Sequence, residues 1–176
     1  MQQALRRRLR KKGHIIFQNE ALGRSKGGFT TKLHLACDGK GRLLAAMLTP
    51  GQQHDCTQLE PLLDAICVRR TGPGRPRKKP DYLLADRGYS YLKYRKILRY
   101  RGIRHSIPER RDQVKQRKSK PGRPLHFDKD RYKQRNVVER FINRLKHWRG
   151  IATRFEKRAT YFYAAICIAA VVDWLK

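Results

Sequence analysis

The pattern of polar and apolar residues predicts strands and helices from residue 29 onward. Polar and apolar positions alternate in "FTTKLHLA", and a second apolar run, "LLAAMLTP", follows after two glycine-containing dipeptides, "DG" and "KG". Alternating runs on both sides of such a turn are typical of a β-hairpin. Pro50 and Gly51 end the second run, so the first predicted unit is a hairpin over residues 29–51.

Three later segments have helical spacing. Positions 59, 62, 63 and 66 are apolar, and Asp55 stands before them as an expected N-cap. The stretch "YLKYRKILRYRG" predicts an amphipathic helix that ends at Gly102. The apolar run 161–172 is closed by Asp173. With about twelve residues it is too short to span a bilayer, so we expect a buried helix, in the core or at an interface.

The remaining segments complete a predicted α/β domain. Short apolar runs at "DYLLADRG" and "IRHSIP" predict two strands, and a basic helix is predicted over residues 131–149. Two basic segments rich in proline and glycine, 69–80 and 109–127, are expected to be linkers. This order predicts a mixed sheet covered by helices over residues 29–176. Residues 1–28 are basic, have no strand pattern, and are expected to be irregular.

The net charge of the chain indicates what kind of molecule the protein binds. The chain has 43 Lys and Arg against 14 Asp and Glu, a formal net charge of +29. Such an excess repels itself in a compact fold and is offset by a polyanion, for which nucleic-acid phosphate is the obvious choice. The basic residues are spread over the chain rather than along one amphipathic helix, which disfavours a membrane surface.

The spacing of the cysteines and the N-terminal residues indicate the cellular compartment of the protein. The four cysteines have no paired spacing, which favours reduced thiols in a cytoplasm over a zinc site or disulfides. The first thirteen residues are charged and lack the apolar stretch of a secretory signal. We therefore expect a cytoplasmic protein that is associated with nucleic acid.

One acid stands inside the basic helix "RYKQRNVVERFINRLKHWRG". At 100° per residue, Tyr132, Arg135, Glu139 and Lys146 fall within about 60° of one another, beside an apolar stripe. A surface ladder of ion pairs accounts for such a column and is worth only tenths of a kcal/mol. Alternatively, Glu139 is a metal ligand, and its basic neighbours neutralise phosphates around the metal.

A second acid stands at the end of a predicted strand. Asp86 follows "YLLA", so its side chain is expected at the carboxyl edge of the sheet, where the sites of α/β proteins gather. The alternative is an N-cap for the helix that follows. We expect Asp86 and Glu139 to act together if either binds a metal.

The two basic linkers are candidate DNA contacts. Each contains "PGRP", at 73–76 and 121–124, an incomplete match to the minor-groove AT-hook. Flexible loops that touch the DNA backbone are the simpler interpretation. The basic residues singled out here are Arg75, Arg77, Lys78, Lys79 and Arg123.

The segment "YKQRNVVERFINRLK" resembles the Y-x2-R-x3-E-x6-K signature of bacterial DDE transposases, with Tyr132, Arg135, Glu139 and Lys146 at the signature positions. "LLADRGYS" is similar to the segment that carries their second catalytic aspartate, here Asp86. "GRSKGGFTTKLHLACDGKGRLLAAMLTPGQQHD" resembles the preceding stretch of the IS-four/IS-five group of insertion-sequence transposases.

This resemblance implies an RNase H-like fold in which an Asp-Asp-Glu triad holds two Mg²⁺ (or Mn²⁺) ions. It implies DNA transposition by strand cleavage at the element's ends and strand transfer into double-stranded target DNA. Asp86 and Glu139 would be catalytic metal ligands, and Tyr132, Arg135 and Lys146 would contact DNA phosphates.

The chain departs from this family pattern at its start. The first aspartate of the triad belongs on the first strand of the sheet, but the residues before "GRSKGG" contain no Asp. We therefore expect the C-terminal part of a catalytic domain, without its first strand, that is weakly active or inactive alone. It would be a remnant, or the second reading frame of an element whose full enzyme arises by frameshifting. Its expected protein partners are a second copy in a homodimer or the upstream-frame product. The alternatives are a non-catalytic basic DNA-binding protein and a truncated transposase that acts as an inhibitor.

Overall fold

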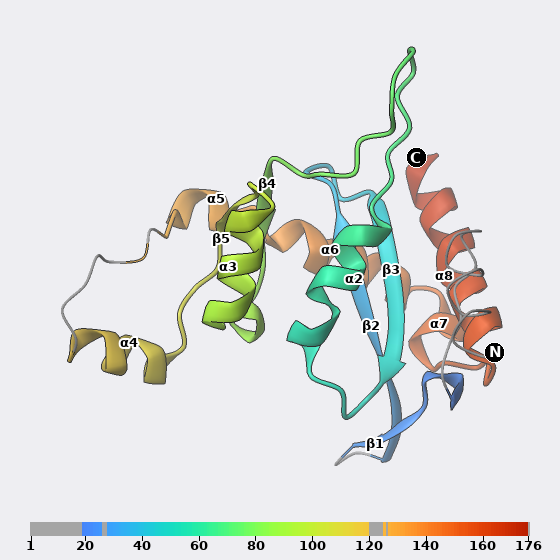
Figure 1. Ribbon diagram of the computed structural model, residues 1–176. Coiled ribbons are helices and arrows are strands. Elements are labelled where there is room, and N and C mark those ends of the chain that lie inside the picture. Colours follow the sequence, from blue (N-terminus) through green and yellow to red (C-terminus); the bar gives the residue numbers. More distant parts are fainter. Residues whose placement is uncertain (1–18, 26–27, 120–124, 126, 176) are drawn as a thin grey trace, which may run out of the picture.

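The computed structural model describes residues 19–25, 28–119, 125 and 127–175 as helices, two small sheets and loops (Figure 1). The strands are β1 (Gly23–Ser25), β2 (Gly28–Cys37), β3 (Leu43–Pro50), β4 (Tyr82–Leu84) and β5 (Arg104–Ser106). The helices are α2 (Leu59–Ala65), α3 (Leu92–Tyr100), α4 (Arg111–Lys118), α5 (Lys129–Lys133), α6 (Asn136–Lys146), α7 (Arg149–Ala152) and α8 (Ala159–Trp174). Short 3₁₀ helices are η1 (Asn19–Ala21), η2 (Asp55–Gln58) and η3 (Arg87–Tyr89).

The predicted hairpin is confirmed as the antiparallel pair β2 and β3. Its turn is held by the Asp38 carboxylate, whose Oδ1 accepts hydrogen bonds from the backbone amides of Lys40 and Arg42, both at 2.9 Å. Gly41 completes the turn with a φ of 85°, in the left-handed region that glycine adopts without a steric penalty. The turn residues therefore fix where the two strands begin and end.

A short strand, β1, precedes the hairpin inside the segment that was predicted to be irregular. It pairs antiparallel with the start of β2, with Gly23 opposite Thr30. The expectation of no strand before residue 28 is therefore wrong. Pairing here is made by the backbone, and the sequence Gly-Arg-Ser has no apolar alternation that would reveal it. Residues 1–18 and 26–27 of that segment lie outside the described residues.

The strands form two separate sheets rather than the single mixed sheet that was predicted. One contains β1, β2 and β3, and the other is the parallel pair β4 and β5, joined by α3. In the part of the chain that the structure describes, no backbone hydrogen bond joins them. Apolar patterns predict strands but not their neighbours, so the α/β class is confirmed and the continuous sheet is not.

Helices α2 and α3 connect the two sheets through a shared apolar core. Leu63 of α2, Leu98 of α3 and Ile107 after β5 are all buried in this cluster, together with Ala45 of β3. The predicted helical stripe is confirmed, because Leu59, Leu62, Leu63 and Ile66 are all buried.

The predicted N-cap of the helix that carries this apolar stripe is wrong. Asp55 is the first residue of η2, and His54 is the N-cap. The Asp55 carboxylate instead forms an ion pair with Lys32 on β2, at 3.0 Å between Oδ1 and Nζ. Asp55 thus pairs with Lys32, which is distant in the sequence, instead of capping the helix that follows it.

The second basic linker, 109–127, contains a helix that the pattern did not predict. Helix α4 buries none of its residues, so no apolar stripe marks it in the sequence. It is stabilised at its start by the Gln113 side chain, which accepts a hydrogen bond from the Arg110 amide at 3.3 Å. An ion pair between Arg117 and Glu109, at 3.1 Å, adds to it. The first linker, 69–80, has no helix or strand.

Helices α6 and α8 pack on the other face of the hairpin, and Figure 1 shows α2 and α8 on opposite sides of β3. Phe141 of α6 and Ile166 of α8 are fully buried there. Arg144 joins the two helices through two bonds to Asp173, Nε to Oδ1 at 2.6 Å and Nη2 to Oδ2 at 2.9 Å. The opposite side of α8 is exposed, so this helix is only partly core.

The four cysteines are free thiols in the structure. Burial raises the pKa of the Cys37 thiol to about 12, which keeps it in its unreactive protonated form. No helix in the described segments combines the length and the apolar character needed to cross a membrane.

Replacing Phe141 by Ala should destabilise the fold by about 3–5 kcal/mol, because the cavity left between α6, α8 and the hairpin cannot collapse fully. Phe141→Leu should cost less, about 1.5 kcal/mol or below. Urea unfolding measures both. Phe155→Ala, at a side chain that is 80% exposed, is the matched control and should change stability by less than about 0.5 kcal/mol. Equal losses in the two alanine variants would contradict this core.

Stability should fall as the pH drops below the ordinary histidine pKa of 6.5. Burial lowers the pKa of His34, whose Nε2 lies 2.8 Å from Thr49 Oγ1. The unfolded chain therefore binds a proton in this range that the folded chain does not, which favours unfolding. Urea unfolding between pH 7 and 5 should give a flatter pH dependence for His34→Gln. A pH dependence for His34→Gln that equals that of the wild type would refute the assignment to His34.

Candidate catalytic and DNA-binding site

Asp86 stands at the carboxyl end of β4, where the sequence placed it. Its side chain is exposed, and its Oδ1 accepts a hydrogen bond from the Gly88 amide at 2.6 Å, as the N-cap of η3. The capping interpretation is therefore confirmed only for the 3₁₀ turn η3, because α3 begins at Leu92 with Tyr91 as its N-cap. Capping uses Oδ1 and leaves Oδ2 without a hydrogen bond from any described residue, so the same carboxylate retains an oxygen for a ligand.

Asp55 brings a second carboxylate beside Asp86. A Cβ built on Gly88 would lie 3.6 Å from Asp86 Oδ1 and 4.0 Å from Asp55 Oδ2, so both acids face the same glycine. Burial, with these two carboxylates nearby, raises the pKa of the Tyr89 phenol. Sequence reasoning missed this pairing, because η2 and η3 meet only through the tertiary fold and nothing local marks it.

The predicted helix over 131–149 is interrupted, which is a correction to the sequence prediction. Helix α5 ends at Lys133 and α6 begins at Asn136. Across the break, the Arg135 amide donates to the Tyr132 carbonyl at 3.0 Å, and Val137 donates to Gln134 at 3.1 Å. These bonds span three residues rather than four, so the chain tightens into a 3₁₀ turn without leaving the helical path.

The break between α5 and α6 leaves most of the predicted column in place, which consists of Tyr132, Arg135, Glu139 and Lys146. The Arg135 guanidinium lies 5.7 Å from the centre of the Tyr132 ring and also forms an ion pair with Glu139. Glu139 has a side chain that is 55% exposed. The surface ion pair is therefore confirmed for Arg135 and Glu139. Lys146 is exposed on the last turn of α6, about 10 Å further along the helix axis than Glu139.

A divalent metal ion needs several donor side chains that lie close together. Among the described residues, no group of three or more His, Cys, Asp or Glu side chains is placed to hold a metal ion. Asp86 and Glu139 are both exposed carboxylates, and Mg²⁺ is commonly bound by one or two carboxylates together with substrate phosphates and water. The two residues thus fit such an ion by donor type, as part of a set that other groups would complete.

The basic loop 69–80 extends away from both sheets (Figure 1). Arg75, Arg77, Lys78 and Lys79 are all exposed on it. Arg77 is tied back by backbone bonds to Val68, at 2.8 and 2.9 Å, and by an ion pair with Asp81. The other three side chains are available to a polyanion. Arg123, the fifth predicted contact, lies outside the described residues.

Comparisons with known proteins identify the family. A family model described as "Transposase DDE domain" matches residues 7–172. A protein of Burkholderia cepacia, named as a transposase for insertion sequence element IS402, is 40% identical over 129 residues, which cover 73% of this chain and 55% of the relative. One of Brucella ovis, named likewise for IS6501, is 31% identical over 147 residues, 84% of this chain and 99% of the relative.

The chain thus spans about half the length of the first of these relatives and nearly all of the second. No solved structure matches the chain. The family model covers almost the whole sequence, including both candidate carboxylates and the Tyr132–Lys146 column. The chain therefore belongs to the DDE-type transposases of insertion sequences.

Proposed function

We propose that this chain forms the C-terminal part of an RNase H-like DDE catalytic domain that cleaves DNA at the ends of an insertion sequence and joins those ends to target DNA. The observation that carries the proposal is the exposed Asp86 carboxylate at the carboxyl edge of β4, in a chain of this family with a net charge of +29. Residues 29–176 would be the catalytic part and residues 1–28 a basic extension.

The described side chains divide into two roles. Asp86 and Glu139 would hold Mg²⁺ or Mn²⁺, which when bound supplies Lewis-acid activation of the scissile phosphate and of the attacking water or 3′-hydroxyl. Arg135 would turn from Glu139 to a DNA phosphate once that carboxylate is occupied. Tyr132 and Lys146 would contact phosphates on either side, as would the basic loop at 69–80.

The two separate sheets support the idea that a further strand completes the domain. Strand β4 pairs with β5 alone, and beyond Thr31 the backbone of β2 pairs with β3 alone among the described residues. Unpaired edges bind added strands readily. A strand that carries the third carboxylate, placed between β2 and β4, would join the halves into one RNase H-like sheet. An upstream-frame product would supply it, or a second subunit in a homodimer.

The second candidate is a DNA-binding protein without catalysis, including a truncated transposase that inhibits the full enzyme. It is favoured by one observation, the absence of a metal-holding cluster of three acids among the described residues. In both cases double-stranded DNA is the partner, and we expect the protein in the bacterial cytoplasm at the nucleoid.

The isolated chain should barely nick DNA that carries the element's ends in Mg²⁺ or Mn²⁺, because the donor set is incomplete. Adding a polypeptide with the upstream strand and its aspartate should raise cleavage strongly, and Glu139→Gln should abolish that gain. Glu156→Gln, at another exposed acid, is the matched control and should leave the gain intact. Gel electrophoresis of labelled DNA measures the products. Robust Mg²⁺-dependent nicking by the isolated chain, lost in Glu139→Gln, would refute the proposed incompleteness.

Asp86→Asn should separate capping from metal binding. Asparagine caps a helix about as well as aspartate, so its stability should stay within a few tenths of a kcal/mol, whereas Asp86→Ala should lose about 1 kcal/mol. Both should lose Mn²⁺ affinity, because neither keeps the charge. Urea unfolding and a Mn²⁺ titration followed by electron paramagnetic resonance provide the two readouts. Wild-type Mn²⁺ affinity in Asp86→Asn would exclude Asp86 as a ligand.

A further inference from the structure

The basic loop between α2 and β4 contains a closed arm, residues 69–76. At the base of the arm, the Val68 amide donates to the Arg77 carbonyl at 2.9 Å, and the Arg77 amide donates to the Val68 carbonyl at 2.8 Å. All residues beyond this bridge are exposed, and Figure 1 shows them extending past the rest of the molecule. With four residues on each side at about 3.3 Å each, the arm reaches roughly 13 Å beyond its base.

The two halves of the arm stay close together up to its tip. A Cβ built on Gly74 would lie 3.8 Å from both Cδ and Nη1 of Arg70, so the Arg70 side chain crosses from one half to the other. Gly74 has a φ of 129°, which glycine adopts at little cost. Pro73 and Pro76 restrict the backbone around it. The chain therefore doubles back at the tip, and the arm has a defined shape before it binds anything.

The arm carries positive charge that has no partner among the described residues. Arg69, Arg70 and Arg75 form no hydrogen bond or ion pair there. Arg77, at the base, is instead paired with Asp81. An unpaired arginine is suited to DNA, because its planar guanidinium matches phosphate oxygens and also guanine O6 and N7 with two parallel hydrogen bonds.

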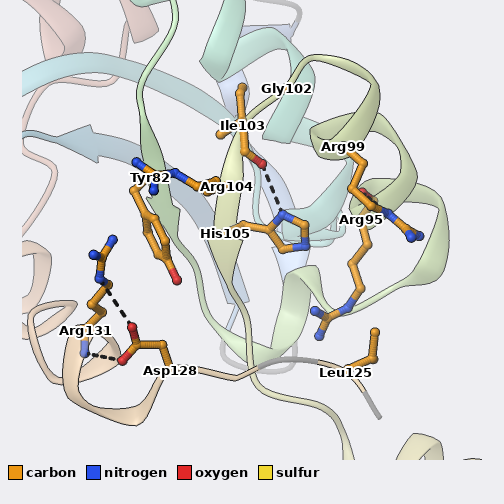
Figure 2. A pocket seen from close by; sticks show the side chains of 10 residues that line it. All are labelled: Tyr82, Arg95, Arg99, Gly102, Ile103, Arg104, His105, Leu125, Asp128 and Arg131. Carbon is orange, nitrogen blue, oxygen red and sulfur yellow. Dashed lines mark hydrogen bonds and ion pairs between the residues drawn. The ribbon is translucent and has the colours of Figure 1, made fainter. Parts of the chain in front are cut away.

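The loop that carries the arm leads directly into the wall of a basic depression of about 770 Å³ (Figure 2). Tyr82 follows the loop on β4, and the guanidinium groups of Arg104 and Arg131 lie 5.9 and 4.7 Å from the centre of its ring. The one acid in the wall, Asp128, is already paired with Arg131. In the described part of the chain, neither Arg99 nor Arg104 of this wall has an ion pair. The surface beside the arm therefore suits the phosphate backbone of a duplex.

The width of the arm decides which groove of duplex DNA it fits. Two paired backbones have axes about 5 Å apart, before the thickness of either chain is counted. A minor groove about 6 Å wide has no room for such a doubled chain, whereas a major groove about 12 Å wide admits a two-stranded ribbon. The reach of roughly 13 Å also exceeds the major-groove depth of about 8.5 Å. The "PGRP" at 73–76 is thus part of a bend that disfavours the minor-groove AT-hook interpretation.

We propose that the arm enters the major groove of duplex DNA, with Arg70 and Arg75 on the edges of guanine bases and Arg69 on a bordering phosphate. The choice of duplex DNA rests on the proposed function, whereas the choice of groove rests on the shape of the arm. An arm that is already closed loses little conformational freedom when it binds. Its base contacts therefore add to the affinity instead of only offsetting the cost of ordering a loop.

The test uses the whole chain in EDTA and follows three labelled duplexes of mixed sequence by fluorescence anisotropy. One duplex is unmodified. In the second, glucosylated 5-hydroxymethylcytosine replaces cytosine and fills the major groove with sugar. In the third, inosine replaces guanine, which removes an amino group from the minor groove and leaves the major-groove edge unchanged.

The arm variant is Arg70→Ala/Arg75→Ala. Its matched control, Lys93→Ala/Lys96→Ala, removes the same charge from exposed positions of α3, and circular dichroism checks that each variant is folded. The wild type should bind the glucosylated duplex about tenfold or more weakly than the unmodified one, and the inosine duplex within about twofold of it. The arm variant should bind the unmodified duplex more weakly and lose most of this discrimination, whereas the lysine control should keep it.

A second pair of variants tests the closed base of the arm without changing any charge. Val68→Pro removes the amide that bonds to Arg77 and should reduce the discrimination against the glucosylated duplex, whereas Val68→Ala keeps the amide and should retain it. Equal wild-type affinity for the unmodified and glucosylated duplexes would overturn the proposal, as would a larger loss with the inosine duplex. Full discrimination in the arm variant or in Val68→Pro would also overturn it. A chain that binds no duplex at all would refute the proposed function together with this inference.

Discussion

Arg144 connects three parts of the chain that are far apart in the sequence. Its guanidinium holds Asp173 of α8 in a two-bond pair, and its Nη2 also donates to the Gly41 carbonyl in the hairpin turn at 3.2 Å. Asp173 is largely buried, and paired charges of this geometry are stronger than exposed ones. The contact fixes α6 against both the hairpin and α8. Because Glu139 is on α6, the position of one candidate metal ligand depends on this arginine.

The rest of the basic surface works against the compact fold. A net charge of +29 repels itself, and many of the ion pairs that offset it lie at exposed side chains, where each is worth little. The apolar clusters between the hairpin and its flanking helices must supply most of the stability. On the proposed function, a bound DNA duplex would relieve the repulsion, and binding would then raise the stability of the fold by mass action.

The elements that the sequence predicted are those with a strong local pattern. The hairpin, the stripe that begins at Leu59, the helix that ends at Gly102 and the apolar last helix all have their own periodicity. The pattern missed β1 and α4, since neither buries an apolar face that alternation or helical spacing would reveal. Asp86 was found because it follows an apolar run, whereas its neighbour Asp55 was not, because only the tertiary fold brings them together.

The open edges of β2 and β4 also affect how chains behave toward one another. Exposed strand edges are templates for pairing between molecules, and mutual repulsion between highly charged chains opposes such pairing. Salt screens that repulsion over about 10 Å at 0.1 M. On the proposed function, moderate salt would release the protein from DNA and would also weaken the repulsion that keeps the chains apart. Solubility and release from nucleic acid would then have opposite salt requirements, and the further strand proposed above would remove this conflict by covering the two edges.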